Sequence, residues 1–215
     1  MEIILGIDEA GRGPVIGPMV ICGYSIEKDK LEELKNLGVR DSKELSRDER
    51  EKLFEKIINI SYKYKYIIIS PKEIDYYVKK NRLNLLEFKN MIKIIKEIRP
   101  NTVIIDSPIK NTKKVVEIIK NNLDFEVNII AENKADKNYP IVSAASIIAK
   151  VIRDREIDKI KKETNINFGS GYPSDEKTIK AIKENYDKLR DYIRESWLTI
   201  KKIKKSNQKN ITDFL

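Results

Sequence analysis

Four acidic residues occupy positions where a carboxylate could bind a metal ion. Asp8 and Glu9 end the apolar segment ILGIDE, Asp106 ends VIID, and Asp136 lies in ENKADKNYP before a long helical pattern. A carboxylate at the end of a buried strand loses hydration and needs a turn, a cationic partner or a metal to compensate for this loss. Carboxylate oxygens suit hard cations such as Mg²⁺ or Mn²⁺. If the two strands are neighbours, we expect Asp8 and Asp106 to meet, with Asp136 alongside.

Simpler interpretations exist for each acid. Asp106 is followed by Ser-Pro and could be an ordinary turn residue, and Asp136 could be a solvated acid at the start of a helix. Adjacent residues of a regular strand point to opposite faces, so Asp8 and Glu9 can both point into one site only if the strand becomes irregular there. Gly11 and Gly13 would permit such an irregularity.

The composition excludes several other chemistries. The 215 residues include no histidine and one cysteine, which rules out intrachain disulfides, Cys/His zinc sites and an imidazole base. The formal net charge is +9, and residues 150–215 contain 17 basic and 11 acidic side chains. This distribution favours a polyanionic partner. The first segment of the chain contains too few apolar residues for a secretory signal or a membrane span. We therefore expect a cytoplasmic protein with no membrane partner.

A glycine-rich segment follows the first strand. Gly11, Arg12 and Gly13 do not match the GxGxxG spacing, and no GK[ST] follows, so a dinucleotide site or P-loop is disfavoured. A backbone that approaches a ligand closely, with one fixed cation, fits a phosphodiester or a sugar. The alternative is a plain glycine-rich connection in a hairpin.

Hydrophobic periodicity predicts a single α/β domain with a mixed sheet, antiparallel early and parallel late. The predicted strands are Ile3–Ile7, Met19–Ile26, Tyr62–Ile69, Val103–Ile105 and Phe125–Ile130. The predicted helices are Lys30–Leu37, Arg47–Ile60, Leu85–Ile98, Thr112–Asn121, Ile141–Lys162, Ser174–Glu184 and Asp187–Trp197. We expect a catalytic domain over residues 1–165, a small helical cap over 166–200 and a flexible basic tail over 201–215.

Five sequence blocks, in order, resemble the type 2 ribonucleases H, ribonuclease HII. The blocks are GIDEAGRGPVIGPMV, RDSKEL, VIIDSP, NKAD ahead of YPIVSAASIIAKVIRDR, and GSGYPSD. The resemblance implies a ribonuclease-H-like five-stranded sheet flanked by helices. It also implies a divalent-metal-dependent endonuclease that hydrolyses RNA strands, or single embedded ribonucleotides, paired with DNA. The products would have 3′-hydroxyl and 5′-phosphate ends, and the cofactor would be two Mg²⁺ or Mn²⁺ ions.

The resemblance also implies roles for individual residues. The four catalytic and metal-site acids would be Asp8, Glu9, Asp106 and Asp136. The substrate-binding residues would be Gly11, Arg12 and Gly13 at the ribose 2′-hydroxyl and neighbouring phosphate, Tyr172 at the RNA-to-DNA junction, and Lys43, Ser146, Lys150 and Arg153 at backbone phosphates. A 2′-hydroxyl distinguishes RNA from DNA, so close backbone groups and a phenol suit this task. Tyr172 could also be a surface aromatic in a turn, and the lysines could be solvated.

The last eight residues resemble a peptide that binds a sliding clamp. Gln208, Ile211 and Phe214 have the spacing of such peptides, with Leu215 in place of the final aromatic residue. This peptide would form one turn of helix with its apolar side chains in a groove of the partner. The alternatives are a segment that packs on its own domain and a frayed terminus.

Two rival functions share the basic charge. A non-catalytic nucleic-acid-binding module or clamp adaptor would gain nothing from clustered acids that face phosphates, so the four acids favour an enzyme. Another nuclease of the same fold, such as a junction resolvase, is disfavoured by the Gly-Arg-Gly and Tyr172 motifs. We expect a monomer that acts on RNA/DNA hybrids and on duplex DNA containing ribonucleotides.

Overall fold

The computed structural model describes residues 1–39 and 45–212, with side chains described as far as residue 205. Its strands are β1 (Ile3–Ala10), β2 (Met19–Glu27), β3 (Lys63–Ile69), β4 (Thr102–Asp106) and β5 (Asn128–Glu132). Its α-helices are α1 (Leu31–Asn36), α2 (Arg47–Asn59), α3 (Pro71–Val78), α4 (Leu83–Ile98), α5 (Thr112–Lys120), α6 (Ala135–Asn138), α7 (Pro140–Thr164), α8 (Glu176–Glu184), α9 (Tyr186–Leu189) and α10 (Leu198–Thr212). Short 3₁₀ turns cover Lys28–Lys30 and Arg190–Tyr192.

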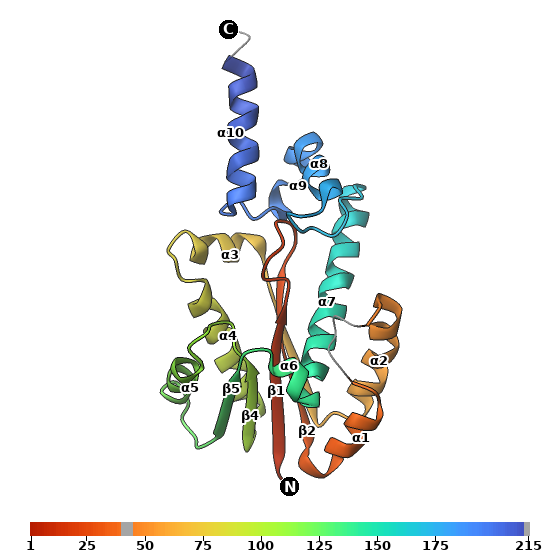
Figure 1. Ribbon diagram of the computed structural model, residues 1–215, viewed down its shortest axis with the longest axis vertical. Coiled ribbons are helices and arrows are strands. Elements are labelled where there is room, and N and C mark those ends of the chain that lie inside the picture. The colour runs from red at the N-terminus through yellow and green to blue at the C-terminus, as the bar shows by residue number, and fades with distance from the viewer. Residues whose placement is uncertain (40–44, 213–215) are drawn as a thin grey trace. The chain divides into compact units, whose positions relative to one another are not determined.

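The strands form one sheet in the order β3-β2-β1-β4-β5, with β1 in the centre (Figure 1). Strand β1 pairs with β2 antiparallel and with β4 parallel, and β4 pairs with β5 parallel. The predicted mixed five-stranded α/β sheet is therefore confirmed.

The chain divides into two compact units, which are described separately. Unit 1 comprises residues 1–10, 20–68 and 84–153, and unit 2 comprises residues 11–19, 69–83 and 154–215. The domain bounds given by the sequence analysis stay a prediction.

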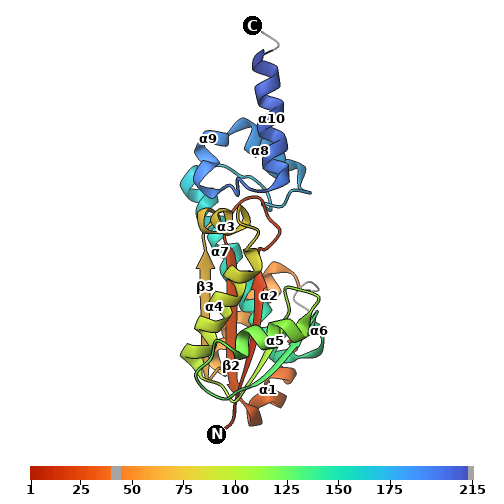
Figure 2. The same ribbon diagram turned by 90° about the vertical axis from the view of Figure 1, so that its left-hand side faces the viewer.

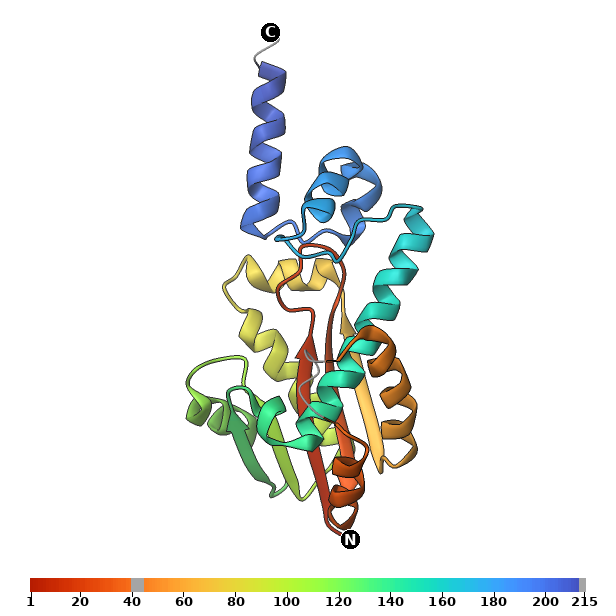
Figure 3. The same ribbon diagram turned by 45° about the vertical axis from the view of Figure 1, so that its right-hand side comes forward.

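In unit 1, helices cover both faces of the sheet. Alternate residues of β1 and β2, such as Ile4 and Tyr24, pack into a core with α1, α2, α6 and the first half of α7. These helices lie beside one face of the sheet in Figure 3, and α4 and α5 lie beside the other in Figure 2. Nearly every residue in the first half of α7 is buried, and its small and branched side chains share one apolar core with residues of β1, β2, α2 and α6.

A glycine on β1 allows α7 to lie very close to the sheet. A Cβ atom on Gly6 would collide with the backbone carbonyl of Ile141, in the first turn of α7. Because Asp8 is on the same face of β1 as Gly6, this close approach brings the start of α7 next to Asp8.

Unit 2 has its own apolar core. Ile200 and Ile203, one turn apart on α10, are buried in this core with Val15, Phe168 and Leu189. Helix α10 continues from this core to Thr212, and the flexible basic tail expected over 201–215 stays a prediction. The predicted helix Asp187–Trp197 was wrong in extent, since the regular helix ends at Leu189 and a 3₁₀ turn follows.

Candidate active site

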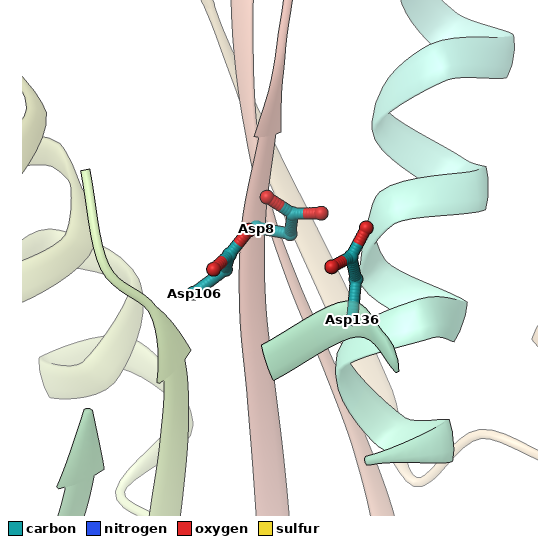
Figure 4. Close-up of side chains that lie close together, drawn as sticks. All are labelled: Asp8, Asp106 and Asp136. Carbon is teal, nitrogen blue, oxygen red and sulfur yellow. The ribbon is translucent and has the colours of Figure 1, made fainter. Parts of the chain in front are cut away.

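Three of the predicted acids meet in unit 1. Asp8 lies on β1, Asp106 ends β4 and Asp136 lies on α6, and their carboxylates are directed toward one another in Figure 4. One oxygen from each lies within 4.8 Å of the others. Asp8 and Asp136 are buried, and Asp106 is partly buried. The convergence predicted from the sequence is confirmed for these three acids.

The register of the sheet places two of them side by side. In the parallel pair, Ile7 lies opposite Ile105, so the next residue of each strand is an aspartate on the same face. The third acid is brought in by a hydrogen bond. The backbone N–H of Ala135 donates to Oδ1 of Asp106 at 3.1 Å, which fixes the start of α6 beside β4. The Ser143 hydroxyl donates to the backbone carbonyl of Asp136 and joins α6 to α7.

The surroundings of Asp8 make its negative charge costly. Burial, together with the charge of Asp106, raises the pKa of Asp8 to about 8. A hydrogen bond from the Ser146 side chain on α7 and one from the backbone N–H of Glu9, at 2.6 Å, oppose this rise. Three close carboxylates in a poorly solvated place repel one another, and a divalent cation would reverse that repulsion. The all-oxygen donor set thus fits a hard ion such as Mg²⁺ or Mn²⁺.

Glu9 is not in this group of three. Strand β1 stays regular through Ala10, which pairs with Val20, so the irregularity that would turn Glu9 toward Asp8 does not occur. The Glu9 side chain therefore points to the face of the sheet opposite to that of Asp8. Its charge still contributes to raising the pKa of Asp8. A catalytic or metal-binding role for Glu9 stays a prediction.

The predicted ribose-binding residues meet in unit 2. Gly13 and Tyr172 are neighbours, since a Cβ atom on Gly13 would lie 3.7 Å from Cε1 of Tyr172. The tyrosine is 40% exposed. The backbone N–H groups of Val15 and Ile16 both donate to the carbonyl of Gly171, at 2.8 and 3.2 Å. The Gly-Arg-Gly loop and the tyrosine turn are thus bonded into one substructure.

The other predicted residues have mixed outcomes. Ser146 is buried, and its side chain bonds to Asp8, an interaction that the sequence did not reveal. On the same helix Arg153 is mostly buried and Lys150 is partly buried. Residues outside the described set, or with side chains outside it, are Lys43, Gln208, Ile211, Phe214 and Leu215.

Comparison with known proteins assigns the family. The sequence model of the family described as Ribonuclease HII matches residues 5–200. This chain belongs to the ribonuclease HII family. Ribonuclease HII of Pyrococcus abyssi is 45% identical over 220 residues, which cover 99% of this chain and 97% of that protein.

Two solved structures agree with this assignment. The ribonuclease H2 of Pyrococcus horikoshii OT3 superposes with a TM-score of 0.87 at 43% identity, covering 96% of this chain and 99% of that one. The complex of PCNA with RNase HII from Archaeoglobus fulgidus contains a chain with a TM-score of 0.83 at 36% identity, covering 91% of this chain and 95% of that one. The ribonuclease-H-like fold is confirmed.

Membership in the ribonuclease HII family assigns the chain a ribonuclease H activity, the hydrolysis of RNA paired with DNA. The family depends on divalent metal, which agrees with the cluster of Asp8, Asp106 and Asp136. Within the described residues, none of the helices combines the length and the apolar character needed to span a membrane.

Proposed function

We propose that this ribonuclease HII chain cuts the RNA strand of RNA/DNA hybrids and also nicks duplex DNA beside a single embedded ribonucleotide. The products would carry 3′-hydroxyl and 5′-phosphate ends. The observation that supports metal-assisted hydrolysis is the convergence of Asp8, Asp106 and Asp136. The observation that supports recognition of a ribose is that Gly13 lies near the Tyr172 ring and that the loop is hydrogen-bonded to Gly171, the residue before the tyrosine.

In this proposal Asp8, Asp106 and Asp136 hold the divalent ions, Mg²⁺ or Mn²⁺, and Glu9 contributes a fourth acid. Bound ions of this kind activate water and stabilise the charge on the departing 3′-oxygen. The protein's part is to hold the carboxylates in place. The Ser146 side chain does so at Asp8, and the Ala135 N–H does so at Asp106. Since the chain contains no histidine, no imidazole takes up the proton of the attacking water.

The substrate's ribose would be recognised by groups of unit 2. Backbone groups of Gly11, Arg12 and Gly13 would contact the 2′-hydroxyl and the neighbouring phosphate, because glycine allows close approach. The exposed ring of Tyr172 would pack against the sugar at the RNA-to-DNA junction. Lys43, Ser146, Lys150 and Arg153 stay proposed contacts to backbone phosphates.

One assay tests the catalytic proposal. A labelled DNA duplex with a single ribonucleotide is incubated with the protein in Mg²⁺, in Mn²⁺ and in chelator, beside an all-DNA duplex of the same sequence. We expect one metal-dependent nick at the ribonucleotide and none in the control duplex. Cleavage of long hybrids without cleavage at the single ribonucleotide would contradict the proposed nicking of ribonucleotide-containing DNA. It would leave the ribonuclease H activity intact.

We also propose that the C-terminal segment binds a sliding clamp. Two observations support this: the spacing of Gln208, Ile211 and Phe214, and the solved complex of PCNA with the relative from Archaeoglobus fulgidus. Helix α10 continues to Thr212, so part of the segment is already helical, as an apolar groove would require.

Deletion of residues 208–215 tests the clamp proposal. We expect the truncated protein to cleave short duplexes at the wild-type rate and to lose measurable binding in a calorimetric titration with the clamp. A double substitution of Lys201 and Lys202 by glutamine is the matched control, since it changes charge on the same helix and leaves the motif intact. Unchanged affinity after deletion would refute the proposal.

A further inference from the structure

The side chain of Arg194, in unit 2, is completely buried. Its guanidinium donates to three backbone carbonyls of the glycine-rich loop. Nη2 donates to Gly11 at 2.6 Å and to Gly17 at 2.9 Å, Nη1 donates to Arg12 at 2.9 Å, and Nε donates to Gly17 at 3.0 Å. One side chain therefore joins the two ends of the loop, across about 180 residues of sequence.

These bonds also set the direction of the loop's N–H groups. In a trans peptide, the carbonyl oxygen of one residue and the N–H of the next lie in one plane and point in opposite directions. Because Arg194 draws the carbonyls of Gly11 and Arg12 toward itself, the N–H groups of Arg12 and Gly13 point away from it. Two successive N–H groups that point the same way suit an anion or a hydroxyl oxygen.

The segment around Arg194 is itself firmly held. Its backbone N–H donates to the carbonyl of Val15 at 2.9 Å. Trp197 donates from Nε1 to the carbonyl of Gly13 at 3.2 Å, and its ring lies 5.1 Å from the Arg194 guanidinium carbon. The carboxylate of Asp75 accepts the N–H groups of Glu195 and Ser196, at 2.8 and 2.9 Å. Arg194 is thus a fixed support for the loop.

We propose that Arg194 is a positioning residue for ribose recognition, which acts by holding the Gly11–Gly17 loop in the conformation that receives the 2′-hydroxyl and its phosphate. This inference rests on the proposed function of the loop. The planar guanidinium is essential to it, because a lysine ammonium lacks the fork that reaches three carbonyls at once. Trp197 adds a weaker support at Gly13.

The test uses three variants of the full chain, R194K, W197F and R190K. R190K is the matched control, since Arg190 is exposed in the neighbouring 3₁₀ turn. With metal, kcat and KM are measured on the single-ribonucleotide duplex at a temperature where circular dichroism shows each variant folded. We expect R194K to lower kcat/KM about 100-fold, mostly through kcat, because a small misplacement of a binding group has an effect of this size. We expect W197F to lower kcat/KM about fivefold and R190K to leave kcat/KM unchanged.

A binding measurement distinguishes a positioning role of Arg194 from a general loss of DNA binding. In chelator, R194K should lose the preference for the ribonucleotide duplex over the all-DNA duplex and keep its all-DNA affinity within about twofold. An equal loss on both duplexes, or a folded R194K with wild-type kcat/KM, would overturn the proposal. If R194K does not fold, the proposal is tested with W197F. An unchanged kcat/KM in W197F would then contradict the positioning role of this segment.

A structural readout keeps this test independent of the proposed function. In glycine-labelled protein, the amide signals of Gly11, Gly13 and Gly17 should shift in both R194K and W197F, and those of Gly6, Gly23 and Gly38 in unit 1 should shift little. Unshifted loop signals would overturn the inference even if the enzyme is active. A wild-type protein that fails to nick the substrate while these signals shift would instead refute the proposed function and leave Arg194 as the support of the loop.

Discussion

The two regions proposed to act on the substrate are built in different ways. The three acids of unit 1 are placed by regular elements: Asp8 and Asp106 by the register of paired strands, and Asp136 by a helix that begins beside them. The Gly11–Gly17 loop of unit 2 has no regular structure of its own. It is held by hydrogen bonds from residues far along the chain, above all from Arg194.

This difference predicts different kinds of sensitivity. A paired strand shares its position with the whole sheet, so the acids should tolerate substitutions around them and fail only when a carboxylate or the spacing of the layers changes. A loop held by a few side chains should respond to each of these separately, with graded effects on recognition.

The largest effect is expected for Asp8→Asn. The amide has the same shape but lacks the negative charge that a divalent ion needs, so cleavage should fall by about 10³-fold or more. Folding should be retained, because burial and Asp106 already disfavour the ionised form of Asp8 and raise its pKa. The measurements are cleavage of the single-ribonucleotide duplex and thermal unfolding in chelator. Undiminished turnover would remove Asp8 from the site.

Gly6 and Gly23 provide a matched pair on the two faces of the sheet. A Cβ at Gly6 would meet the backbone of Ile141 and push α7 away from Asp8, whereas a Cβ at Gly23 would meet the side chains of Ile94 and Leu5 on the other face. Both alanine variants should lose about 1–3 kcal/mol of stability by overpacking. We expect G6A to lower kcat at least about tenfold more than G23A does when both are folded. Equal losses of kcat would show that the α7 spacing does not matter to the acids.

The same contrast explains what the sequence could and could not predict. Asp8 and Asp106 end apolar segments, and any fold that pairs these strands in parallel brings them together, so their convergence was predictable. Glu9 was assigned with them from the resemblance, although strand alternation argues against a shared face, and the regular β1 follows the alternation. Arg194 was not found, because a single arginine in a polar C-terminal segment carries no periodic signal. Only the packed structure shows which carbonyls it reaches.

The smallest effect is expected at the turn that carries Tyr172. The Asp175 carboxylate accepts bonds from the N–H and the hydroxyl of Ser170, at 2.7 and 2.8 Å, and from the N–H of Lys177 at 3.0 Å. These bonds lower the pKa of Asp175 to about 2. Asp175→Asn keeps some of them but loses the charge. We expect a loss of about 1 kcal/mol, because the group is partly solvated, and a decrease in Tm of about 2–4 °C.

The pH dependence gives this prediction its sign. Asp175 stays ionised to a lower pH in the folded protein than in the unfolded chain, where the pKa of its carboxyl has the ordinary value of 3.8. Its stabilisation is therefore complete above pH 3.8 and is lost as the pH falls toward about 2. The difference in Tm between wild type and D175N should be constant near neutral pH and should shrink below pH 4. Because the turn is bonded to the Gly11–Gly17 loop, D175N should also weaken discrimination between ribose and deoxyribose a few-fold. A variant with lowered Tm but unchanged discrimination would show that the loop keeps its conformation without the bonds of Asp175.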